Sequence, residues 1–398
     1  MASGVYISVP FCRTKCSYCN FASDVFSRVA FQRYVDRVCQ QIAAWRQTAM
    51  EMGGRAEAQV DSVYLGGGTP TVLDADQLYR IFSAVRNEFH LEPDAEVTVE
   101  CAPGTLTPEM RETLLRCGVN RVSLGVQSFV DGEAAAVGRL HKRATIVDDI
   151  AHLRAAGITN INIDLIAGLP HQTAASWDES LAETIAAGVP HVSVYMLEVD
   201  EDSRLGRELI AGGTRYHAHF VPDEDAIADF YIAACEKLER AGVPQYEISN
   251  LAREGFQSRH NLKYWTRRPY LGFGVDAHSM LPSVSANEEG VRFATTDSLE
   301  KYVAGAPMQR TVVSQATALE ENFFLGLRLN EGIDLHKIDL SFGQVVVERV
   351  ASSVSELIDH GLIKRVGNRI HLTARGRLLS NEVFQAFLTS AEVPARLL

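Results

Sequence analysis

The stretch PFCRTKCSYCNF, residues 10–21, is the most informative part of the chain because it holds Cys12, Cys16 and Cys19 in one short segment. An iron-sulfur cubane has four irons and normally takes four cysteine thiolates, so three cysteines leave one iron free to bind another molecule. The CxxxCxxC spacing differs from ferredoxin runs, in which a fourth cysteine follows, and from zinc sites, which need a second pair of ligands. The spacing therefore predicts a 4Fe-4S cluster with one open coordination position.

Cysteines spaced i, i+4 and i+7 also share one face of a helix, where they would pack as small apolar side chains. The flanking residues argue against that alternative. The strand-like VYISVP comes directly before the cysteines, Pro10 opens the segment, and the polar run RTK separates the first two thiols. The four remaining cysteines lie in apolar or helical contexts, where we expect packing residues: Cys39, Cys101, Cys117 and Cys235.

Length and composition favour a packed globular protein. At ~150 residues per domain, 398 residues predict two or three units, or one large barrel with an appendage. The apolar content of 46% is typical of a chain with a sizeable core. A strand is expected from Val5, which leaves no room for an export signal, and no run of ~18 apolar residues could span a bilayer. Seven cysteines in such a chain indicate the reducing cytosol.

Strand-like runs alternate with helical segments over the first half of the chain. We expect strands at 5–9, 62–66, 96–101, 121–127, 160–166 and 191–197. Helical spacing is found at 31–52, 75–89 and 108–117. Strands that are apolar at nearly every position, as in NINIDLIAG, suit a parallel sheet covered by helices, and right-handed crossovers curl such a sheet. The expected fold is α/β, a partial (β/α)6 barrel, with a doubly wound open sheet as the structural alternative.

The pattern changes beyond about residue 200. A long helix is expected over 223–241, and an irregular stretch rich in glycine and aromatic residues over 246–279. The last hundred residues predict helices at 318–329 and 345–360, two short strands around a Gly367-Asn368 turn and a helix from Arg375. Helices with a small hairpin indicate a helical, winged-helix-like C-terminal domain. The expected domains are a barrel at 1–240, a linker segment at 241–310 and the C-terminal domain at 311–398.

Winged helices often bind DNA, although a fold does not decide function. The formal net charge of −12 argues against nucleic acid as a partner, because nonspecific binding requires clustered Lys and Arg. A DNA-binding regulator that senses redox state through its cluster is therefore only an alternative reading of this chain.

A glycine-rich turn follows the second expected strand, in the sequence GGGTP. Gly67, Gly68 and Thr69 would let a ligand approach the backbone and use its N–H and C=O groups. A Gly-Pro turn is also an ordinary strand end, and this one lacks the GK[ST] of a phosphate loop. Its position one strand after the cysteine segment favours a ligand site.

Polar side chains stand at or near the ends of the next strands, where barrels of this kind hold their reactive groups. Glu100 ends the third strand, Gln127 ends the fourth, and Asp164 interrupts the fifth; Arg139 follows in AVGRLH. A buried carboxylate is costly unless a ligand or a cation pairs with it, a salt bridge inside the barrel being the alternative. Several polar groups at one mouth predict a ligand site.

Together these motifs carry a resemblance. PFCRTKCSYCNF, GGGTP, VECAPGTL, LGVQSF, GRLH and IDLIAGLP resemble the radical S-adenosylmethionine proteins of the oxygen-independent coproporphyrinogen III oxidase group, over nearly the whole chain. The resemblance implies that the three cysteines hold the 4Fe-4S cluster and that the amino and carboxylate groups of S-adenosylmethionine chelate the fourth iron. Electron transfer then cleaves the sulfonium to methionine and a 5'-deoxyadenosyl radical.

The same resemblance implies which residues contact the cofactor. Tyr6 and Tyr18 would lie near the cluster and the cofactor. The methionine amino group would meet Gly67, Gly68 and Thr69. The rest of the cofactor would be contacted by Glu100, Gln127, Arg139 and Asp164, with Asp164 near the ribose hydroxyls.

Within this group the chain is similar to the HemW branch of bacterial heme chaperones. Members that decarboxylate coproporphyrinogen III usually carry a fourth cysteine two residues after the third and an N-terminal extension. Here Asn20-Phe21 follows Cys19, and the chain starts a few residues before Tyr6. HNLKYW, residues 260–265, matches that branch's HNxxYW motif. VECAPG departs from the expected pattern at Cys101-Ala102, which affects one local contact.

The HNLKYW segment suggests a heme site. Histidine nitrogen is a common axial ligand of heme iron, and aromatic rings offer flat apolar area to a porphyrin. His260 is therefore the expected heme ligand. In the alternative, the aromatic residues plug the loop against the barrel, His260 caps a backbone group and another histidine binds the iron.

The sequence thus favours a heme chaperone that binds heme and delivers it to apo-hemoproteins, including respiratory membrane enzymes. We expect it in the cytoplasm or peripherally at the inner face of the membrane. Its cluster would require an electron donor, and S-adenosylmethionine would serve a redox, dimerisation or release step; monomer and homodimer both stay open. The alternative is oxidative decarboxylation of coproporphyrinogen III, so whether the protein is an enzyme is left open.

Overall fold

One large mixed sheet carries most of the chain. The computed structural model describes residues 2–388, and for residues 344–349 it describes the backbone alone. Neighbouring strands follow the order β11-β10-β9-β8-β1-β2-β3-β4-β5-β6-β7. Their bounds are β1 (Ser3–Val9), β2 (Gln59–Gly67), β3 (His90–Cys101), β4 (Arg121–Gln127), β5 (Asn160–Ala167), β6 (His191–Met196), β7 (Asn250–Ala252), β8 (Tyr270–Gly274), β9 (His278–Leu281), β10 (Gly290–Ala294) and β11 (Gln309–Val313).

The six expected strands are confirmed as β1 to β6, and they run parallel to one another. β7 joins β6 antiparallel, and the strand order begins at β11 and ends at β7, as in an incomplete barrel. Because parallel strands have their C-terminal ends at the same edge of a sheet, the loops that follow β1 to β6 lie together at one mouth of the barrel. This edge is where the predicted cofactor residues stand.

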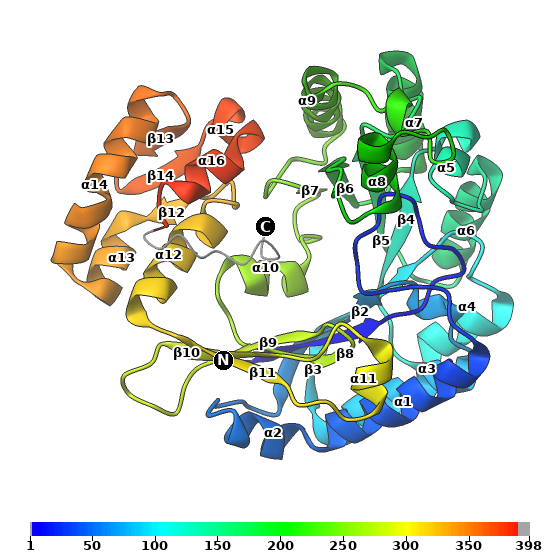
Figure 1. Cartoon of the computed structure of the whole chain (residues 1–398), viewed down its shortest axis with the longest axis horizontal. Helices are drawn as coiled ribbons and strands as arrows, with labels where there is room; N and C mark the ends of the chain where they lie inside the picture. The colour runs from blue at the N-terminus through cyan, green and yellow to red at the C-terminus, as the bar shows by residue number, and fades with distance from the viewer. Residues whose placement is uncertain (1, 389–398) are drawn as a thin grey trace.

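Helices cover the outside of the sheet (Figure 1). A capping box between Asp74 and Gln77 starts one of them, and Gly188 in a left-handed conformation ends another. The apolar faces of the helices and the outward strand residues form one core, which includes Val63, Val99 and Ile163. The helices are α1 (Arg28–Ala43), α2 (Trp45–Glu51), η1 (Pro70–Val72), α3 (Ala75–Glu88), α4 (Pro108–Arg116), α5 (Asp131–Ala136), α6 (Arg143–Ala155), α7 (Ala174–Ala187), α8 (Arg204–Ala211), η2 (Ala218–Phe220), α9 (Glu224–Arg240), α10 (Arg259–Trp265) and α11 (Leu299–Val303).

The stretch 246–279, expected to be irregular, instead contains β7, α10 and β8, and β9 begins within it. β8 pairs parallel with β1, so this part of the chain adds strands to the other edge of the sheet. The glycines of β8 make this stretch resemble a loop in the sequence. Packing explains Gly272, because a side chain there would collide with the His278 carbonyl. The domain boundaries at 240 and 310 stay a prediction.

The C-terminal unit has its own core and a winged-helix order of elements. Its helices and strands are α12 (Gln315–Gly326), β12 (Ile333–Asp334), α13 (Leu335–Phe342), α14 (Gln344–Asp359), β13 (Ile363–Val366), β14 (Arg369–Leu372), α15 (Ala374–Leu378) and α16 (Ser380–Gln385). The three strands form a separate sheet, and a second hydrophobic cluster lies between it and the helices. Figure 1 shows this unit, in orange and red, beside the barrel. The expected unit 311–398 ends in residues 389–398, which lie outside the described part.

A buried acidic residue forms ion pairs between the two units. Glu321 of α12 forms ion pairs with Arg267, after α10, at 2.8 Å and with Arg292 of β10 at 2.6 Å. Its side chain is only 1% exposed, so the two guanidinium groups compensate a charge that water cannot reach. The contact fixes the first helix of the C-terminal unit to the strands that extend the sheet.

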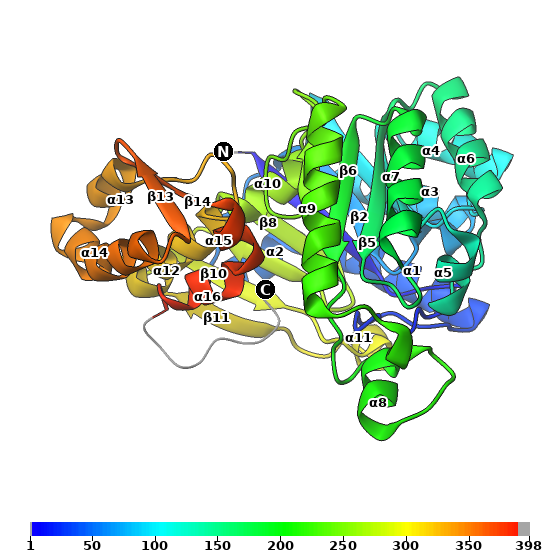
Figure 2. The ribbon, with the colours of Figure 1, turned by 90° about the horizontal axis from the view of Figure 1, so that it is seen from above.

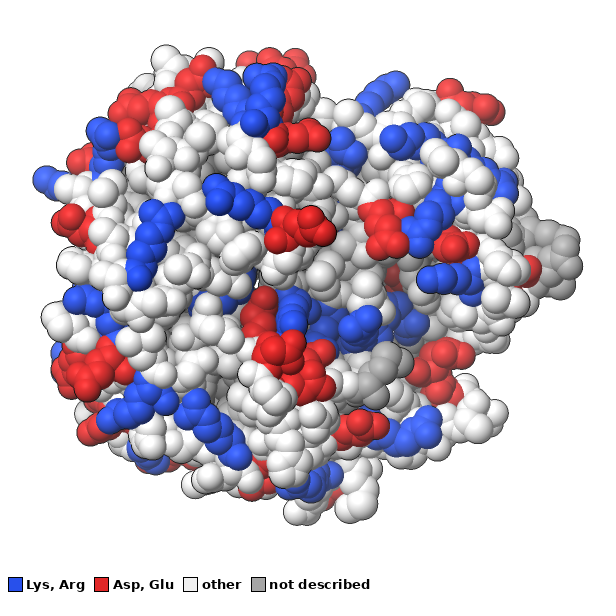
Figure 3. Space-filling view, turned by 180° about the vertical axis from the view of Figure 1, so that it is seen from behind, with Lys and Arg blue, Asp and Glu red and all other residues white. Residues whose placement is uncertain are grey.

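Within residues 2–388, every helix is too short or too polar to serve as a bilayer-spanning segment. On the face seen in Figure 3, acidic and basic side chains are interspersed, and a group of basic side chains lies in a recess near the centre.

Candidate functional site

The three cysteines lie in the loop that follows β1. Backbone hydrogen bonds close this loop at its base, from Cys12 N–H to the Asp24 carbonyl and from Asp24 N–H to the Pro10 carbonyl, both at 3.0 Å. The Lys15 ammonium donates to the carbonyls of Phe21 and Ser23, at 3.0 and 2.8 Å. The loop that carries the three cysteines is therefore folded back on itself.

The glycine-rich turn after β2 supports the cysteine loop. Gly68 N–H donates to the Val9 carbonyl and Thr69 N–H to the Phe11 carbonyl, each at 2.7 Å. These bonds hold the turn so close that Gly68 has no room for a side chain. The prediction that GGGTP accompanies the cysteines at the mouth is thus met in the structure.

Burial raises the pKa of the Cys12 and Cys19 thiols. Iron binds the thiolate, so the charge of a cluster would offset the cost of burying these groups. Among residues 2–388, no three His, Cys, Asp or Glu side chains surround one point as ligands of a single ion do. A 4Fe-4S cluster does not need three ligands around one point, because each cysteine thiolate binds a different iron atom of the cluster.

Glu100 stands at the end of β3 beside the glycine turn. Its carboxylate accepts a hydrogen bond from the Tyr64 hydroxyl at 2.8 Å and from Gly67 N–H at 3.1 Å. Burial, and next the negative charge of Asp164, raise the pKa of Glu100 to about 7. The Tyr6 ring lies 6.1 Å from the Tyr64 ring, so Tyr6 belongs to the same interior face.

Asp164 of β5 is also half-buried, and burial raises its pKa. Its carboxylate accepts hydrogen bonds from Ser123 of β4 at 3.1 Å and from the Asn162 amide at 2.7 Å. The sequence reasoning missed Tyr64, Ser123 and Asn162. The available signal was a polar residue at every second position of an otherwise apolar strand, which marks the interior face of a barrel.

Arg139 joins the cysteine loop to the strand ends. Its guanidinium lies beside the Tyr18 hydroxyl. A side chain on Gly125 would meet both the Gln127 amide nitrogen, at 3.1 Å, and an Arg139 guanidinium nitrogen, at 3.2 Å. The buried Nε of Arg139 has no hydrogen-bond partner among the described residues. Tyr18, Gln127 and Arg139 therefore lie together, as the resemblance implied.

These observations fit S-adenosylmethionine. Two carboxylates with raised pKa values face one interior, where a cationic ligand with hydroxyl and amino donors would stabilise their charged forms. The unpartnered Nε–H of Arg139 is available to an acceptor on the ligand. The residues present can thus hold both the cationic and the carboxylate ends of an amino-acid cofactor.

His260 lies away from this mouth. A side chain on Gly4, at the start of β1, would meet His260 and Ser62, which places His260 at the amino-terminal end of the strands. Its ring nitrogens are bonded to the Ser62 hydroxyl at 3.0 Å and the Tyr264 hydroxyl at 2.9 Å, and the residue is 1% exposed. Burial and Lys263 lower its pKa to about 3.

Helix α10, which carries the HNLKYW motif, closes that end of the barrel. Glu96 of β3 accepts hydrogen bonds from the backbone N–H groups of Arg259 and His260, each at 3.1 Å. The Lys263 ammonium lies 2.6 Å from the Asp61 carboxylate. A heme iron could reach His260 only after this helix moved, so the geometry favours the alternative in which the segment plugs the barrel.

Two family models match the chain. Residues 6–184 match the radical SAM superfamily and residues 313–379 match the HemN C-terminal domain. The protein named heme chaperone HemW from Lactococcus lactis is 32% identical over 97% of both chains. The chain belongs to the HemW family of radical SAM proteins. The HemW protein of Bacillus subtilis is likewise 32% identical, over 96% of this chain and 98% of its own.

Two further comparisons also cover most of the chain. A mitochondrial protein of Bos taurus, named radical S-adenosyl methionine domain-containing protein 1, is 30% identical over 83% of this chain and 74% of its own. Among solved structures, coproporphyrinogen III oxidase HemN from Escherichia coli superimposes with a TM-score of 0.80 over 98% of this chain and 90% of its own, at 23% identity. The expected fold class, a partial radical SAM barrel with a helical C-terminal domain, is confirmed. Membership of the radical SAM superfamily implies a 4Fe-4S cluster and S-adenosylmethionine.

Proposed function

We propose that the protein is a heme chaperone, which binds heme and transfers it to apo-hemoproteins. The observation that carries the proposal is full-length similarity to proteins named heme chaperone HemW, in a chain whose third cluster cysteine is followed by Asn20-Phe21. No further cysteine follows at the position where coproporphyrinogen III decarboxylases resembling this chain carry one.

Cys12, Cys16 and Cys19 would hold the 4Fe-4S cluster, and Gly67, Gly68 and Thr69 would receive the methionine part of S-adenosylmethionine. When bound, the pair supplies one-electron reductive cleavage of the sulfonium. The chain's own contributions are positioning and exclusion of water. Asp164 would accept hydrogen bonds from ribose hydroxyls, while the Arg139 guanidinium would orient the Tyr18 hydroxyl beside the cluster loop.

Oxidative decarboxylation of coproporphyrinogen III is the second candidate. The favouring observation is the superposition on HemN over nearly the whole chain, although likeness at 23% identity bears on the fold and not on the substrate. The two candidates make opposite predictions for one substrate, which allows a single assay to separate them.

The test uses full-length protein with a reconstituted cluster under anaerobic conditions. One arm titrates heme and follows the absorption spectrum. The other supplies coproporphyrinogen III, S-adenosylmethionine and a strong one-electron reductant, and weighs the product by mass spectrometry. The proposal requires stable heme binding with no loss of carbon dioxide from the porphyrinogen. Turnover to protoporphyrinogen IX would overturn it, as would failure to bind heme.

Transfer to respiratory membrane enzymes, an electron donor for the cluster and a homodimer stay predictions. So do the cytoplasmic location and association with the inner face of the membrane.

A further inference from the structure

Histidine is a common axial ligand of heme iron, and the iron must be able to reach its ring nitrogen, which most buried histidines of the barrel do not allow. Besides His260, His191 has both ring nitrogens engaged, with Asn162 at 2.6 Å and with the Tyr246 hydroxyl at 3.0 Å. His141 is buried with its Nε2 against the Val126 carbonyl at 3.0 Å. Within the described chain, the ligand is therefore better sought among histidines nearer the surface.

His171 and His217 form such a pair near the mouth. His171 follows β5, whereas His217 directly precedes η2, and their Nε2 and Nδ1 atoms are 3.1 Å apart. The Phe220 ring stacks on His171 at 4.2 Å and is 56% exposed. The His171 N–H also donates to the Phe220 carbonyl at 2.9 Å, so two distant segments hold these rings together.

The backbone at both histidines is strained. His171 has φ +67° and His217 has φ +62°, in the left-handed region that non-glycine residues seldom adopt. Such a conformation persists where the surrounding structure requires it. Two strained histidines that share one hydrogen bond and one aromatic neighbour are thus held in a defined arrangement.

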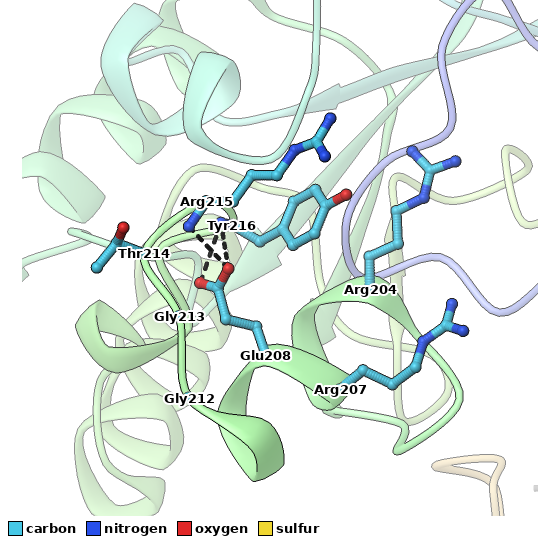
Figure 4. A pocket seen from close by; sticks show the side chains of 8 residues that line it. All are labelled: Arg204, Arg207, Glu208, Gly212, Gly213, Thr214, Arg215 and Tyr216. Carbon is cyan, nitrogen blue, oxygen red and sulfur yellow. Dashed lines mark hydrogen bonds between the residues drawn. The ribbon is translucent and has the colours of Figure 1, made fainter.

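A basic hollow of about 550 Å³ lies next to this pair along the chain, since its lining ends at Tyr216, the residue before His217. Arg204 and Arg207 line it from α8, and Arg215 and Tyr216 line it from the loop that leads to His217 (Figure 4). Glu208 is the acidic residue of the lining, and its carboxylate accepts hydrogen bonds from the backbone N–H groups of Arg215, Tyr216 and Ala218. Its oxygens serve the backbone and pair with none of the arginines. The Arg204 guanidinium donates one N–H to the Lys15 carbonyl and the Arg207 guanidinium one to the Ser203 carbonyl, each at 3.3 Å, which leaves further N–H groups to bind carboxylates of a ligand.

We propose that this surface, made of His171, His217, Phe220 and the hollow lined by the three arginines, is the heme-binding site; the inference rests on the proposed function. If His217 Nδ1–H donates to His171 Nε2, then His217 Nε2 keeps its lone pair for the iron and His171 fixes the tautomer. Phe220 supplies an exposed ring to the porphyrin face. The arginines pair with the two propionates, which lie along one edge of the heme.

The site adjoins the cluster loop. Leu205 N–H, at the start of α8, donates to the Ser17 carbonyl at 2.8 Å, and the Asn20 amide donates to the Asp200 carboxylate at 2.9 Å. α8 projects from the barrel in Figure 2, and these bonds attach its base to the cysteine segment. A change in the cluster loop can thereby reach the arginines that would hold the propionates.

The test titrates heme into full-length wild-type protein and into His217→Ala, with His219→Ala as a matched control on the same loop. Absorption and electron paramagnetic resonance spectra report the axial ligand, and circular dichroism confirms the fold. We expect a changed spectrum and about tenfold or greater loss of affinity for His217→Ala, a smaller loss for His171→Ala, and wild-type behaviour for His219→Ala.

A second arm addresses the arginines with the double variant Arg204→Gln/Arg207→Gln. It should weaken binding of heme but leave binding of heme dimethyl ester unchanged, because the ester lacks the carboxylates. Wild-type protein that binds heme while His217→Ala shows an unaltered spectrum and affinity would overturn this inference and leave the chaperone proposal standing. Wild-type protein that binds no heme would instead overturn the chaperone proposal.

Discussion

Gly68 and Cys12 are packed against each other so closely that a β carbon on Gly68 would lie 3.0 Å from the Cys12 sulfur and 2.5 Å from the Phe11 carbonyl oxygen. The second contact is with backbone, which cannot swing aside as a side chain can. The glycine turn and the cysteine loop are therefore one structural unit, and the space at Gly68 decides the position of the first cluster thiol.

Gly68→Ala is expected to displace the cysteine loop and lower the iron and sulfide retained after reconstitution. The measurement is iron and acid-labile sulfide per chain, with the visible absorption of the cluster. Gly132→Ala is the matched control, because its added carbon would meet no atom of another segment within 4 Å and the residue is in helix α5. It should retain a full cluster and gain up to ~1 kcal/mol of stability. Full iron content in Gly68→Ala would contradict the packing argument.

The raised pKa of Glu100 predicts a pH dependence of stability. Between its ordinary value of 4.5 and about 7, the folded chain holds a proton that the unfolded chain releases. The contribution of Glu100 to stability is thus present below this window and is lost as pH rises through it. Urea unfolding of cluster-free protein, at pH values from about 5 to about 8, should show a shallower decline for Glu100→Gln than for wild type. The exposed-site variant Glu300→Gln should follow wild type; identical slopes for all three proteins would refute the assignment.

Asp164→Asn is expected to weaken S-adenosylmethionine binding by roughly tenfold to a hundredfold, because hydrogen bonds to a charged group contribute about 1.5–3 kcal/mol. The asparagine amide offers one acceptor oxygen where the carboxylate offers two, so the Ser123 and Asn162 donors would compete with the cofactor for that oxygen. Calorimetric titration of the cofactor into anaerobic, cluster-loaded protein gives the affinity. Asp148→Asn, an exposed change on α6, is the control. Equal affinities in the two variants would remove Asp164 from the cofactor site.

His260→Ala tests whether the HNLKYW segment is a plug or a heme site. Loss of the bonds to Ser62 and Tyr264, together with a cavity at the barrel end, should cost about 2–4 kcal/mol of unfolding free energy. Urea unfolding measures the cost, and heme titration of the folded variant should give a wild-type spectrum. A stable variant with an altered heme spectrum would instead restore His260 as the ligand.

Glu321→Gln should loosen the C-terminal unit. The substitution leaves Arg267 and Arg292 without their shared counter-charge in a buried contact, which costs about 3–5 kcal/mol. Limited proteolysis should then cut between the barrel and α12 at lower protease concentration than in wild type. Glu236→Gln breaks an exposed ion pair with Arg240 and should change the cutting pattern little. The same resistance in both variants would show that the Glu321 contact does not hold the units together.

Much of the fold follows from local patterns. Apolar runs of strand length that alternate with helical spacing predicted β1 to β6, and the hairpin at Gly367 was read from its turn residues. The same patterns failed for β8, whose glycines resemble a loop in isolation. Its strand conformation depends on pairing with β1, a partner distant in the chain.

The cysteine spacing and the residues after each strand predict an open cluster and a cofactor mouth, and the structure places the side chains named for them at one end of the barrel, where the cluster and the cofactor stay a proposal. Only the tertiary structure shows that Tyr64, Ser123 and Asn162 support the two carboxylates, that the HNLKYW helix closes the opposite end of the barrel, and that His171 meets His217. The reason is physical: which side chains share an interior depends on strand register and on packing between distant segments, and neither leaves a local pattern in the chain.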